Sequence, residues 1–580
     1  MVRRTSPRSR RQLPPGRRIS LAFVFFLLIG LLLGGRLFHL AVVRHAAFEA
    51  QAKEQQTFRS VLEPRRGELF LQDRFGARFP AGINETFWLV YAVPKDIKDP
   101  EAVAEKLVPI LSLAKPALMP RLSKPGDPFE PLARRVPLET KEKILGLGIQ
   151  GIGAKEDPGR LYPNGELLAH TLGFLSYQNE EPKGQYGLEE YYEKLLRGEP
   201  GYAEGSKDTE GLAIFTSRFF RKEPKDGASL YLTIDPNIQF KTEEALKRAM
   251  EKFGPEEGTA LVMETKTGKM LAMASQPAFN PNAYGETKGV KQFLNPAVSK
   301  IFEPGSVFKV ITMAAAIDSG AVSSNTVYTD TGEVRIGGYT IKNSDLKAHG
   351  TMTMTNVLEK SLNTGAIFAV RKTGFEKFRS TVAAFGLGEK TGVDLAGEIA
   401  GNLSNLKRDS DIAFATASFG QGIAVTPIEL LAGISAVANS GKLVKPYLVE
   451  KIVLPDGRVE EQRLEEKRQV IKTETSSTVT AMLISAVENG YGKPARIPGY
   501  FVAGKTGTAQ VPSPDERGYS DKTVHTFVGW APAYDPKFTM LISFRNPQGV
   551  RFAEGSAAPI FNEVGSFILN YYEVPPDKTK

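Results

Sequence analysis

The chain has 580 residues, of which 41% are apolar and 24% charged, and it contains no cysteine. This length exceeds what one hydrophobic core usually serves, so we expect two or more folded modules, and the composition excludes a disordered chain and a multi-span membrane protein. The lack of cysteine excludes disulfides, thiolate zinc sites, iron–sulfur clusters and a cysteine nucleophile. The five histidines are scattered without a ligand-like spacing, so we expect no metal site and no cofactor.

The formal net charge of +9 comes almost entirely from the N-terminus. Residues 1–18 carry seven arginines and no acidic residue, which leaves a net charge of only +2 for the rest of the chain. The basicity therefore belongs to a short tail, and we expect no nucleic-acid partner.

An apolar segment follows this tail directly. Residues 19–43 contain a single charged residue, Arg36, and their number fits the roughly 20 residues that a bilayer core requires. The arginines before the segment predict a cytoplasmic N-terminus and place everything after residue 43 outside. The alternative is a cleaved signal peptide, but its apolar region would span only about 7 to 15 residues. We therefore predict a cytoplasmic basic tail over 1–18 and a transmembrane anchor over 19–43.

The remaining chain divides by its pattern into two parts. Residues 44–225 mix strand-like runs, helical stretches and many proline and glycine turns, without a repeat. Residues 226–580 are more regular and begin with two apolar runs, 259–265 and 269–275, whose short turn predicts a β-hairpin. Helical patterns follow at 306–319, 355–371, 427–439 and 475–488.

Strand-like segments return between residues 499 and 546, and a closing helix is expected over 557–572. Thr426 and Pro427 are typical of the N-cap and first position of a helix. Strands at both ends of a helical middle predict an α+β module whose sheet is assembled from both ends.

Three short patterns in the second part together suggest an active-site serine enzyme: Ser-x-x-Lys, Ser-x-Asn and Lys-Thr-Gly. Each pattern alone carries little information, because the chain contains four, two and four copies of them, respectively. Local context must therefore select among the copies.

Ser306 follows a Glu-Pro-Gly turn and opens a helical pattern. In the first turn of a helix, free backbone N–H groups and the helix dipole favour negative charge on a serine oxygen. Lys309 lies on the same helical face, and its apolar neighbours favour the desolvation that lowers the pKa of a lysine and makes it a base. A plain N-cap role for Ser306 is the alternative. The other copies precede a proline or lie in polar stretches: Ser112, Ser344 and Ser404.

Ser361 and Asn363 fall where one helical pattern gives way to another. Both side chains could project from an interhelical turn, where a hydroxyl can relay a proton and an amide can hold a peptide bond. Capping of the helix end is the alternative. The other copy, at 323–325, lies in a connection that looks exposed.

Lys505 lies in residues 501–511, a run of strand character. On a strand, Thr506 and Thr508 point to one face and can bind a substrate carboxylate, while Gly507 lets a ligand approach the backbone. The Lys505 cation would attract that carboxylate and lower the pKa of a neighbouring lysine. An incidental lysine on a strand is the alternative. The other copies lie in a hairpin turn, at a helix end and in a glycine-rich loop: Lys266, Lys372 and Lys390.

With these elements in this order, the sequence resembles the class B penicillin-binding proteins, the monofunctional D,D-transpeptidases of peptidoglycan synthesis. The resemblance covers nearly the whole chain. Its supporting segments are residues 66–76, 160–174, 186–201, 232–239, 295–309, 419–431, 504–512 and 525–533.

The resemblance implies an α+β protein with a single N-terminal transmembrane helix. An elongated mixed pedestal or dimerisation module would occupy 44–225. A transpeptidase domain, with a central antiparallel sheet flanked by helices, would occupy 226–580.

The resemblance also implies residue roles. Ser306 would be the nucleophile and Lys309 its base. Ser361 would relay the proton, and Asn363 would hold the substrate amide. Lys505 would support the Ser361 hydroxyl electrostatically. Substrate would bind at Thr506, Gly507 and Thr508, and the backbone N–H groups of Ser306 and Thr508 would form the oxyanion hole. The donor would be a D-Ala-D-Ala stem peptide and the acceptor an amine of a neighbouring stem peptide, with β-lactams mimicking the donor.

Expectations about biology follow from the same resemblance. The segment Ile-Phe-Glu-Pro-Gly-Ser, which ends at Ser306, resembles the division-type, FtsI-like branch more than the elongation branch. No glycosyltransferase module is recognised, so we expect a membrane glycan polymerase and division or elongation proteins as partners, at the bacterial cytoplasmic membrane with the catalytic domain outside. Alternatives of another class are a catalytically weak scaffold of the division complex, a β-lactam sensor and a hydrolase.

The sequence departs from the family pattern in two places. The segment between Gly67 and Asp73 is two residues longer than usual. An even insertion preserves which side chains face which side of a strand, although a β-bulge is the alternative. Val307 replaces the commoner threonine after the nucleophile, a position that supplies no obligatory catalytic group.

Overall fold

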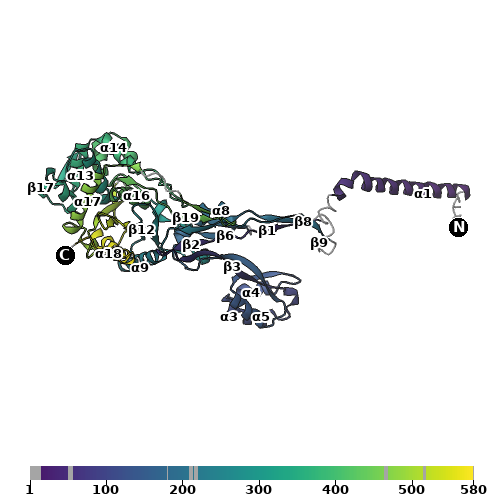
Figure 1. The fold of residues 1–580 in the computed structure, drawn as a ribbon. Coiled ribbons are helices and arrows are strands. Elements are labelled where there is room, and N and C mark those ends of the chain that lie inside the picture. The colour runs from purple at the N-terminus through teal and green to yellow at the C-terminus, as the bar shows by residue number, and fades with distance from the viewer. Residues whose placement is uncertain are drawn as a thin grey trace, which may run out of the picture. The chain divides into compact units, whose positions relative to one another are not determined.

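The computed structural model describes residues 15–49, 57–178, 181–207, 213–214, 220–462, 468–513 and 518–578 (Figure 1). Residues 1–14 of the predicted basic tail lie outside these ranges. The chain forms two compact units, one from Met1–Pro64 with Glu199–Lys225 and one from Arg65–Gly198 with Asp226–Lys580.

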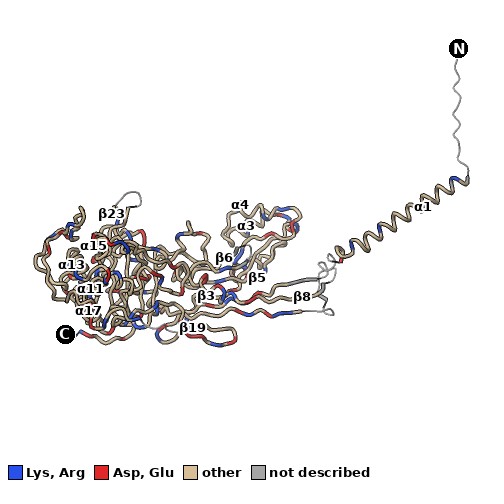
Figure 2. Tube along the Cα trace, turned by 90° about the horizontal axis from the view of Figure 1, so that it is seen from above, with Lys and Arg blue, Asp and Glu red and all other residues tan. Residues whose placement is uncertain are grey.

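The first unit contains the apolar segment. Helix α1, Pro15–Phe38, continues into a π-helical turn, His39–Val43, and its arginines lie near its two ends (Figure 2). Ile19–Val43 is long and apolar enough to cross a membrane. The rest of this unit is a small antiparallel sheet around β8, whose strands are β1 Thr57–Leu62, β8 Gly201–Lys207, β9 Ala213–Ile214 and β10 Phe220–Lys222.

The second unit contains a seven-stranded sheet that joins the 65–198 segment to the C-terminal part of the chain. Its strand order is β20-β19-β11-β2-β3-β4, with β5 also paired to β3. The strands are β2 Leu69–Gln72, β3 Arg78–Ala92, β4 Glu130–Val136, β5 Ile152–Leu161, β11 Ser229–Leu232, β19 Val449–Val453 and β20 Val459–Glu461. The register between β2 and β3 shifts between Leu69 and Phe70, so the two-residue insertion is accompanied by the irregularity that a β-bulge would produce.

Shorter elements complete the 65–198 segment. A separate apolar core packs three helices against β3 and β4: α3 Pro100–Leu111, α4 Lys115–Leu122 and α5 Leu138–Gly146. The hairpin and short helices that follow are α6 Ala169–Leu172, β6 Phe174–Gln178, β7 Glu181–Gln185, α7 Gly187–Tyr191 and α8 Glu193–Arg197.

A five-stranded antiparallel sheet in the order β13-β12-β24-β23-β22 forms the centre of the C-terminal part. Its strands are β12 Glu257–Met263, β13 Met270–Gln276, β22 Ala503–Pro512, β23 Tyr519–Ala531 and β24 Phe538–Arg545. The predicted hairpin at 259–275 pairs with strands from beyond residue 500. This confirms the expectation that the sheet is assembled from both ends.

Alternation along the strands explains why both faces of this sheet are covered. On β12, Ala260 and Val262 belong to one apolar core, whereas Leu261 and Met263 belong to the other. The first core contains the helices α9 Pro236–Phe253 and α18 Ala557–Tyr571. The second contains the helices of the predicted helical middle, among them α11 Lys309–Asp318, α12 Met354–Glu359, α13 Asn363–Thr373, α14 Phe375–Ala384, α15 Asp411–Ala417, α16 Pro427–Ala438 and α17 Thr473–Glu488.

Local signals in the sequence explain several of these boundaries. Helix α16 begins at Pro427, with the Thr426 hydroxyl accepting a hydrogen bond from the Glu429 N–H in a capping box. The helical pattern expected over 355–371 forms two helices, α12 and α13. Ser361 separates them, because it adopts a left-handed backbone conformation with φ of 55°.

A buried ionic cluster holds the 65–198 segment together. The Glu189 carboxylate accepts hydrogen bonds from Arg66 Nε and Arg160 Nε, both at 2.8 Å, and from the Tyr162 hydroxyl at 3.2 Å. Burial alone would raise the pKa of Glu189, but the charges and hydrogen bonds of the two arginines hold it below its ordinary value. Glu189 is therefore the carboxylate that Arg66 and Arg160 share.

We expect Glu189→Ala to lower the free energy of unfolding by about 3–5 kcal/mol, because it leaves buried arginine charge without its partner. Urea denaturation monitored by circular dichroism measures this loss. The matched control is Glu139→Ala, which removes an exposed partner of Lys143 and should leave the unfolding midpoint unchanged. Equal effects of the two substitutions would contradict the role assigned to the cluster.

Candidate active site

The structure places Ser306 and Lys309 at the start of α11. Ser306 lies in a short 3-10 helix, Gly305–Phe308, that leads directly into α11. The Gly305 N–H donates to the Gly420 carbonyl at 3.0 Å, which ties this turn to a distant loop. Lys309 Nζ donates to Ser306 Oγ at 3.1 Å, and the Lys309 side chain is fully buried.

Ser361 and Asn363 approach the same lysine from the turn between α12 and α13. Lys309 Nζ lies 2.6 Å from the Ser361 carbonyl oxygen, 3.3 Å from Ser361 Oγ and 2.8 Å from Asn363 Oδ1. The left-handed conformation of Ser361 is strained for a residue other than glycine, at a cost of about 1–3 kcal/mol. The sharp turn directs both the carbonyl and the hydroxyl of one residue at Lys309.

Lys505 reaches the Ser361 hydroxyl from the opposite side. Its Nζ, on strand β22, donates to Ser361 Oγ at 3.1 Å and to the Thr506 carbonyl at 3.0 Å. The Ser361 hydroxyl therefore lies between two buried amino groups, and Lys505 is only 2% exposed.

The two lysines have strongly lowered pKa values. Burial is the main cause of the low pKa of Lys309, and repulsion by the Lys505 charge adds to it. Burial lowers the pKa of Lys505 to about 7, although the charge of Glu554 opposes this decrease. A neutral Lys309 beside Ser306 Oγ has the lone pair that a general base requires.

Gly507 allows the turn that carries Ser306 to lie against strand β22. A Cβ atom added to Gly507 would lie 2.5 Å from Val307 Cγ2 and 3.0 Å from the Pro304 carbonyl oxygen, so any larger residue would push the two segments apart. This close approach brings the backbone around Ser306 next to the backbone before Thr508. Thr506 is buried and Thr508 half-buried, and Thr508 Oγ1 accepts a hydrogen bond from the Ala553 N–H at 3.1 Å.

Two buried residues that the sequence did not single out support Asn363. Asn343 Oδ1 accepts hydrogen bonds from the backbone N–H groups of Asn363, at 2.9 Å, and Thr364, at 3.3 Å. Asn343 Nδ2 in turn donates to both carboxylate oxygens of Asp330, at 3.0 and 2.9 Å. Asn343 and Asp330 are 1% and 2% exposed. This chain of hydrogen bonds fixes the start of α13 and hence the position of Asn363.

No sequence signal marked this pair. Asp330 ends strand β14, Val327–Asp330, and Asn343 follows strand β16, Tyr339–Lys342, in short hairpin-like segments of polar character. Their separation matches no helical or strand period that would place them together. Only the folded chain brings them to the N-terminus of α13.

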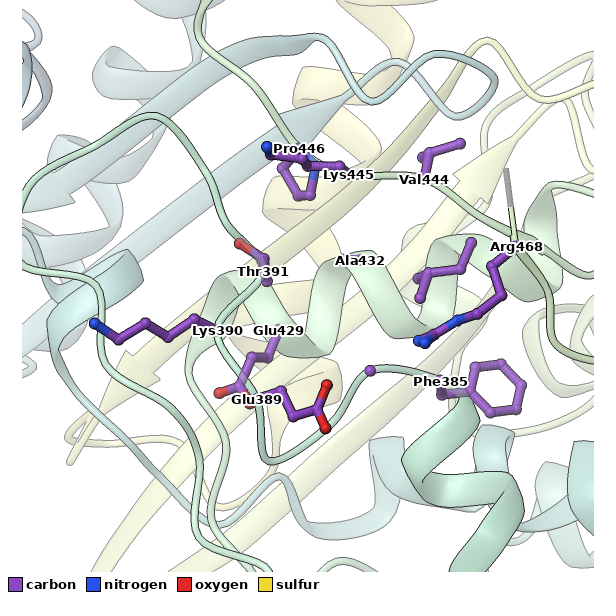
Figure 3. A pocket seen from close by; sticks show the side chains of 12 residues that line it. Phe385, Glu389, Lys390, Thr391, Glu429, Ala432, Val444, Lys445, Pro446 and Arg468 are labelled. Atoms are coloured by element: carbon purple, nitrogen blue, oxygen red, sulfur yellow. The ribbon is translucent and has the colours of Figure 1, made fainter. Parts of the chain in front are cut away.

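One copy that context argued against, Lys390, lies in a different part of the domain. Lys390 and Thr391 line a separate pocket with Glu389 and Glu429 (Figure 3), and none of Ser306, Lys309, Ser361 and Lys505 contributes to its wall. Glu429 there accepts hydrogen bonds from backbone N–H groups and so serves the loop around it. Among the described residues, no group of three or more acidic or histidine side chains is arranged to hold a metal ion.

Comparison with known protein families gives two matches along the chain. Residues 258–565 match the model described as "Penicillin binding protein transpeptidase domain", and residues 62–232 match "Penicillin-binding Protein dimerisation domain". The C-terminal match contains all five residues that come together in the site: Ser306, Lys309, Ser361, Asn363 and Lys505.

Similar proteins cover most of the chain. Stage V sporulation protein D of Bacillus subtilis is 32% identical over 97% of this chain and 87% of its own length. Peptidoglycan D,D-transpeptidase FtsI of Escherichia coli is 32% identical over 87% of this chain and 84% of its own length. The crystal structure of penicillin-binding protein 3 from Mycobacterium tuberculosis in complex with aztreonam has a TM-score of 0.69 at 28% identity, covering 90% of this chain and 98% of that one.

We expect Asn343→Ala to slow acylation by a fluorescent penicillin about 10- to 100-fold, because two backbone N–H groups at the start of α13 lose their acceptor and Asn363 is no longer held in place. Stopped-flow fluorescence gives the second-order rate. The matched control, Asn439→Ala, removes a similar side-chain hydrogen bond to the Lys442 carbonyl and should keep the wild-type rate. A wild-type rate in Asn343→Ala would show that Asn363 needs no such support.

Proposed function

The chain belongs to the penicillin-binding protein transpeptidase family, whose model matches more than half of its residues, and from this premise we propose how its clustered side chains act. It is a class B penicillin-binding protein and a serine-type peptidoglycan D,D-transpeptidase. The observation that carries the proposed mechanism is the buried Lys309 amino group 3.1 Å from Ser306 Oγ.

In the acylation step, neutral Lys309 takes the proton of Ser306 as its Oγ attacks the carbonyl carbon of the penultimate D-Ala. The bond between carbon and Oγ forms, and the bond between carbon and the nitrogen of the terminal D-Ala breaks. The proton passes from Lys309 to the departing nitrogen through the Ser361 hydroxyl, which lies 3.3 Å from Lys309 Nζ. Lys505 holds this hydroxyl at 3.1 Å and favours its transfer of the proton.

Strand β22 supplies the binding surface for the donor peptide. It is the last strand in the order of the five-stranded sheet, so its free edge can pair with an extended peptide. Thr506 and Thr508 bind the terminal carboxylate, and Asn363 holds the substrate amide. The backbone N–H groups of Ser306 and Thr508 stabilise the oxyanion. The close approach at Gly507 supports this last assignment, because it brings the two backbones together.

The remaining assignments concern location and partners. We infer that α1 anchors the chain in the bacterial cytoplasmic membrane with the arginine-rich tail inside and the catalytic part outside. Residues 44–225 act as a pedestal for the transpeptidase domain over 226–580. Similarity to FtsI and to stage V sporulation protein D favours septal wall synthesis with a membrane glycan polymerase over an elongation role.

A non-catalytic scaffold is the second candidate function, and acylation separates the two. We expect mass spectrometry after penicillin treatment to find one adduct, on the peptide that contains Ser306, because this serine opens the segment that leads into α11 and has the buried Lys309 amine 3.1 Å from its Oγ. Ser306→Ala should carry none, whereas Ser404→Ala, a copy of the same pattern, should label like wild type. An adduct that survives in Ser306→Ala contradicts the assignment of the nucleophile.

The rate of acylation should rise with pH as Lys309 loses its proton, with a midpoint well below the ordinary lysine value of about 10.4. Lys505→Gln removes a positive charge that lowers the pKa of Lys309, so its midpoint should move to higher pH. The measurement is the second-order acylation rate from pH 5 to 10.

Lys505→Arg is the matched control, because arginine keeps the positive charge over this whole range. Its midpoint should not exceed that of wild type. If wild type and Lys505→Gln share one midpoint, Lys505 does not tune the base and only holds the Ser361 hydroxyl.

A further inference from the structure

A carboxylate that the mechanism does not use lies beside the binding strand. Glu554 belongs to a short 3-10 helix, Ala553–Gly555, between β24 and α18. The Ala553 N–H donates to Thr508 Oγ1 at 3.1 Å, so this helix is fixed to the end of the Lys-Thr-Gly segment. Glu554 is partly exposed, and its carboxylate makes no hydrogen bond or ion pair with any residue that the structure describes.

Glu554 follows Ala553, whose N–H binds Thr508 Oγ1, and its charge interacts with that of Lys505. Its charge raises the pKa of Lys505 against the larger effect of burial, and Lys505 in turn lowers the pKa of Glu554, which burial has raised. Lys505 Nζ lies 3.1 Å from Ser361 Oγ, so the Glu554 charge acts through Lys505 on the hydroxyl that is proposed to pass a proton to the leaving group.

This position is unfavourable for binding the donor alone. The donor ends in a carboxylate that Thr506 and Thr508 are proposed to hold, and a second carboxylate, on the residue that follows Ala553, repels it. The negative charge of Glu554 becomes favourable once the terminal D-Ala has left. The acceptor then enters the space of the leaving group, and its amine carries a positive charge at neutral pH because the pKa of an alkylamine is about 10.4.

We propose that Glu554 binds the ammonium group of the acceptor stem peptide and favours a side-chain amine that has no carboxylate on the same carbon. The proposal rests on the transpeptidase function and adds the chemistry of its second substrate. An acceptor amine with an adjacent carboxylate brings a negative charge toward Glu554 and is bound less well.

The chemistry of the transfer step balances. The bound ammonium releases one proton to solvent past the Glu554 carboxylate and becomes a neutral amine. The amine attacks the carbonyl carbon of the Ser306 ester, the carbon–nitrogen bond forms, and Lys309 takes the second proton from the nitrogen. The bond between carbon and Ser306 Oγ breaks, and Lys309 returns this proton to Oγ. Ester and ammonium thus give amide, free serine and one proton in solution.

The test measures how the acyl-enzyme divides between transfer and hydrolysis. The full-length protein in detergent receives a D-Ala-D-Ala peptide donor with either Nα-acetyl-lysine amide or D-alanine as acceptor. Mass spectrometry quantifies the amide and the hydrolysed product. Both products arise from one acyl-enzyme, so their ratio is independent of the rate of acylation.

Wild type should favour Nα-acetyl-lysine amide over D-alanine. Glu554→Gln should lower the transfer-to-hydrolysis ratio for the lysine derivative about tenfold and change the ratio for D-alanine much less. Glu554→Lys should reverse the preference. The matched control is Glu389→Gln in the separate pocket of Figure 3, which should keep the wild-type ratios.

The outcomes separate this inference from the function on which it rests. Failure of wild type to form an adduct with penicillin at Ser306 overturns the transpeptidase mechanism itself. If wild type is acylated but transfers to neither acceptor, or if Glu554→Gln and Glu554→Lys keep the wild-type ratios, the role of Glu554 is overturned and the mechanism stands.

Discussion

The site depends on two lysine amino groups buried on either side of one hydroxyl. Lys309 and Lys505 both donate to Ser361 Oγ, at 3.3 and 3.1 Å, from a helix and a strand that are far apart in sequence. Burial of an ammonium group is costly and lowers both pKa values, and repulsion by the Lys505 charge lowers the pKa of Lys309 further. At neutral pH the unfolded chain therefore binds more protons than the folded one. The two lysines therefore lower the free energy of unfolding at neutral pH. This loss becomes smaller as the pH rises toward about 10.4, the pKa of a lysine in the unfolded chain.

The surrounding fold holds this unfavourable arrangement in place. Two apolar cores cover the two faces of the five-stranded sheet, and one of them encloses α11 and the helices around it. The strained turn at Ser361 is supported from behind by Asn343 and Asp330, which bind the start of α13. Close contact at Gly507 then fixes the nucleophile against β22. The turn that carries Ser361 is thus held by two residues that do not themselves take part in the chemistry.

The charge pattern around the site differs between its two sides. Close to Ser306 lie the amino group of Lys309 and, bound to it, the Asn363 amide, which suits a donor that ends in a carboxylate. The Thr508 side adds Glu554, on a helix tied to the strand through Ala553. A serine site that transfers its acyl group to an amine must bind first an anion and then a cation in adjoining space. A carboxylate at the edge of the site gives a physical basis for this order.

The sequence by itself determined many of the local elements and singled out the side chains that the fold brings together. Two apolar runs joined by a short turn predicted the hairpin at 259–275, and helical patterns predicted α11, α16 and α17. Thr426 with Pro427 marked where α16 begins. These signals depend on neighbouring residues alone. The context of each repeated pattern selected Ser306, Ser361 and Lys505 from their copies. Only the tertiary structure decided what surrounds them. Asn343 and Asp330 act on the site through hydrogen bonds between segments that are distant in sequence, Glu554 acts through its charge, and the low pKa of Lys505 comes from its burial. No local pattern encodes such contacts, since they depend on how the helices and the sheet pack together.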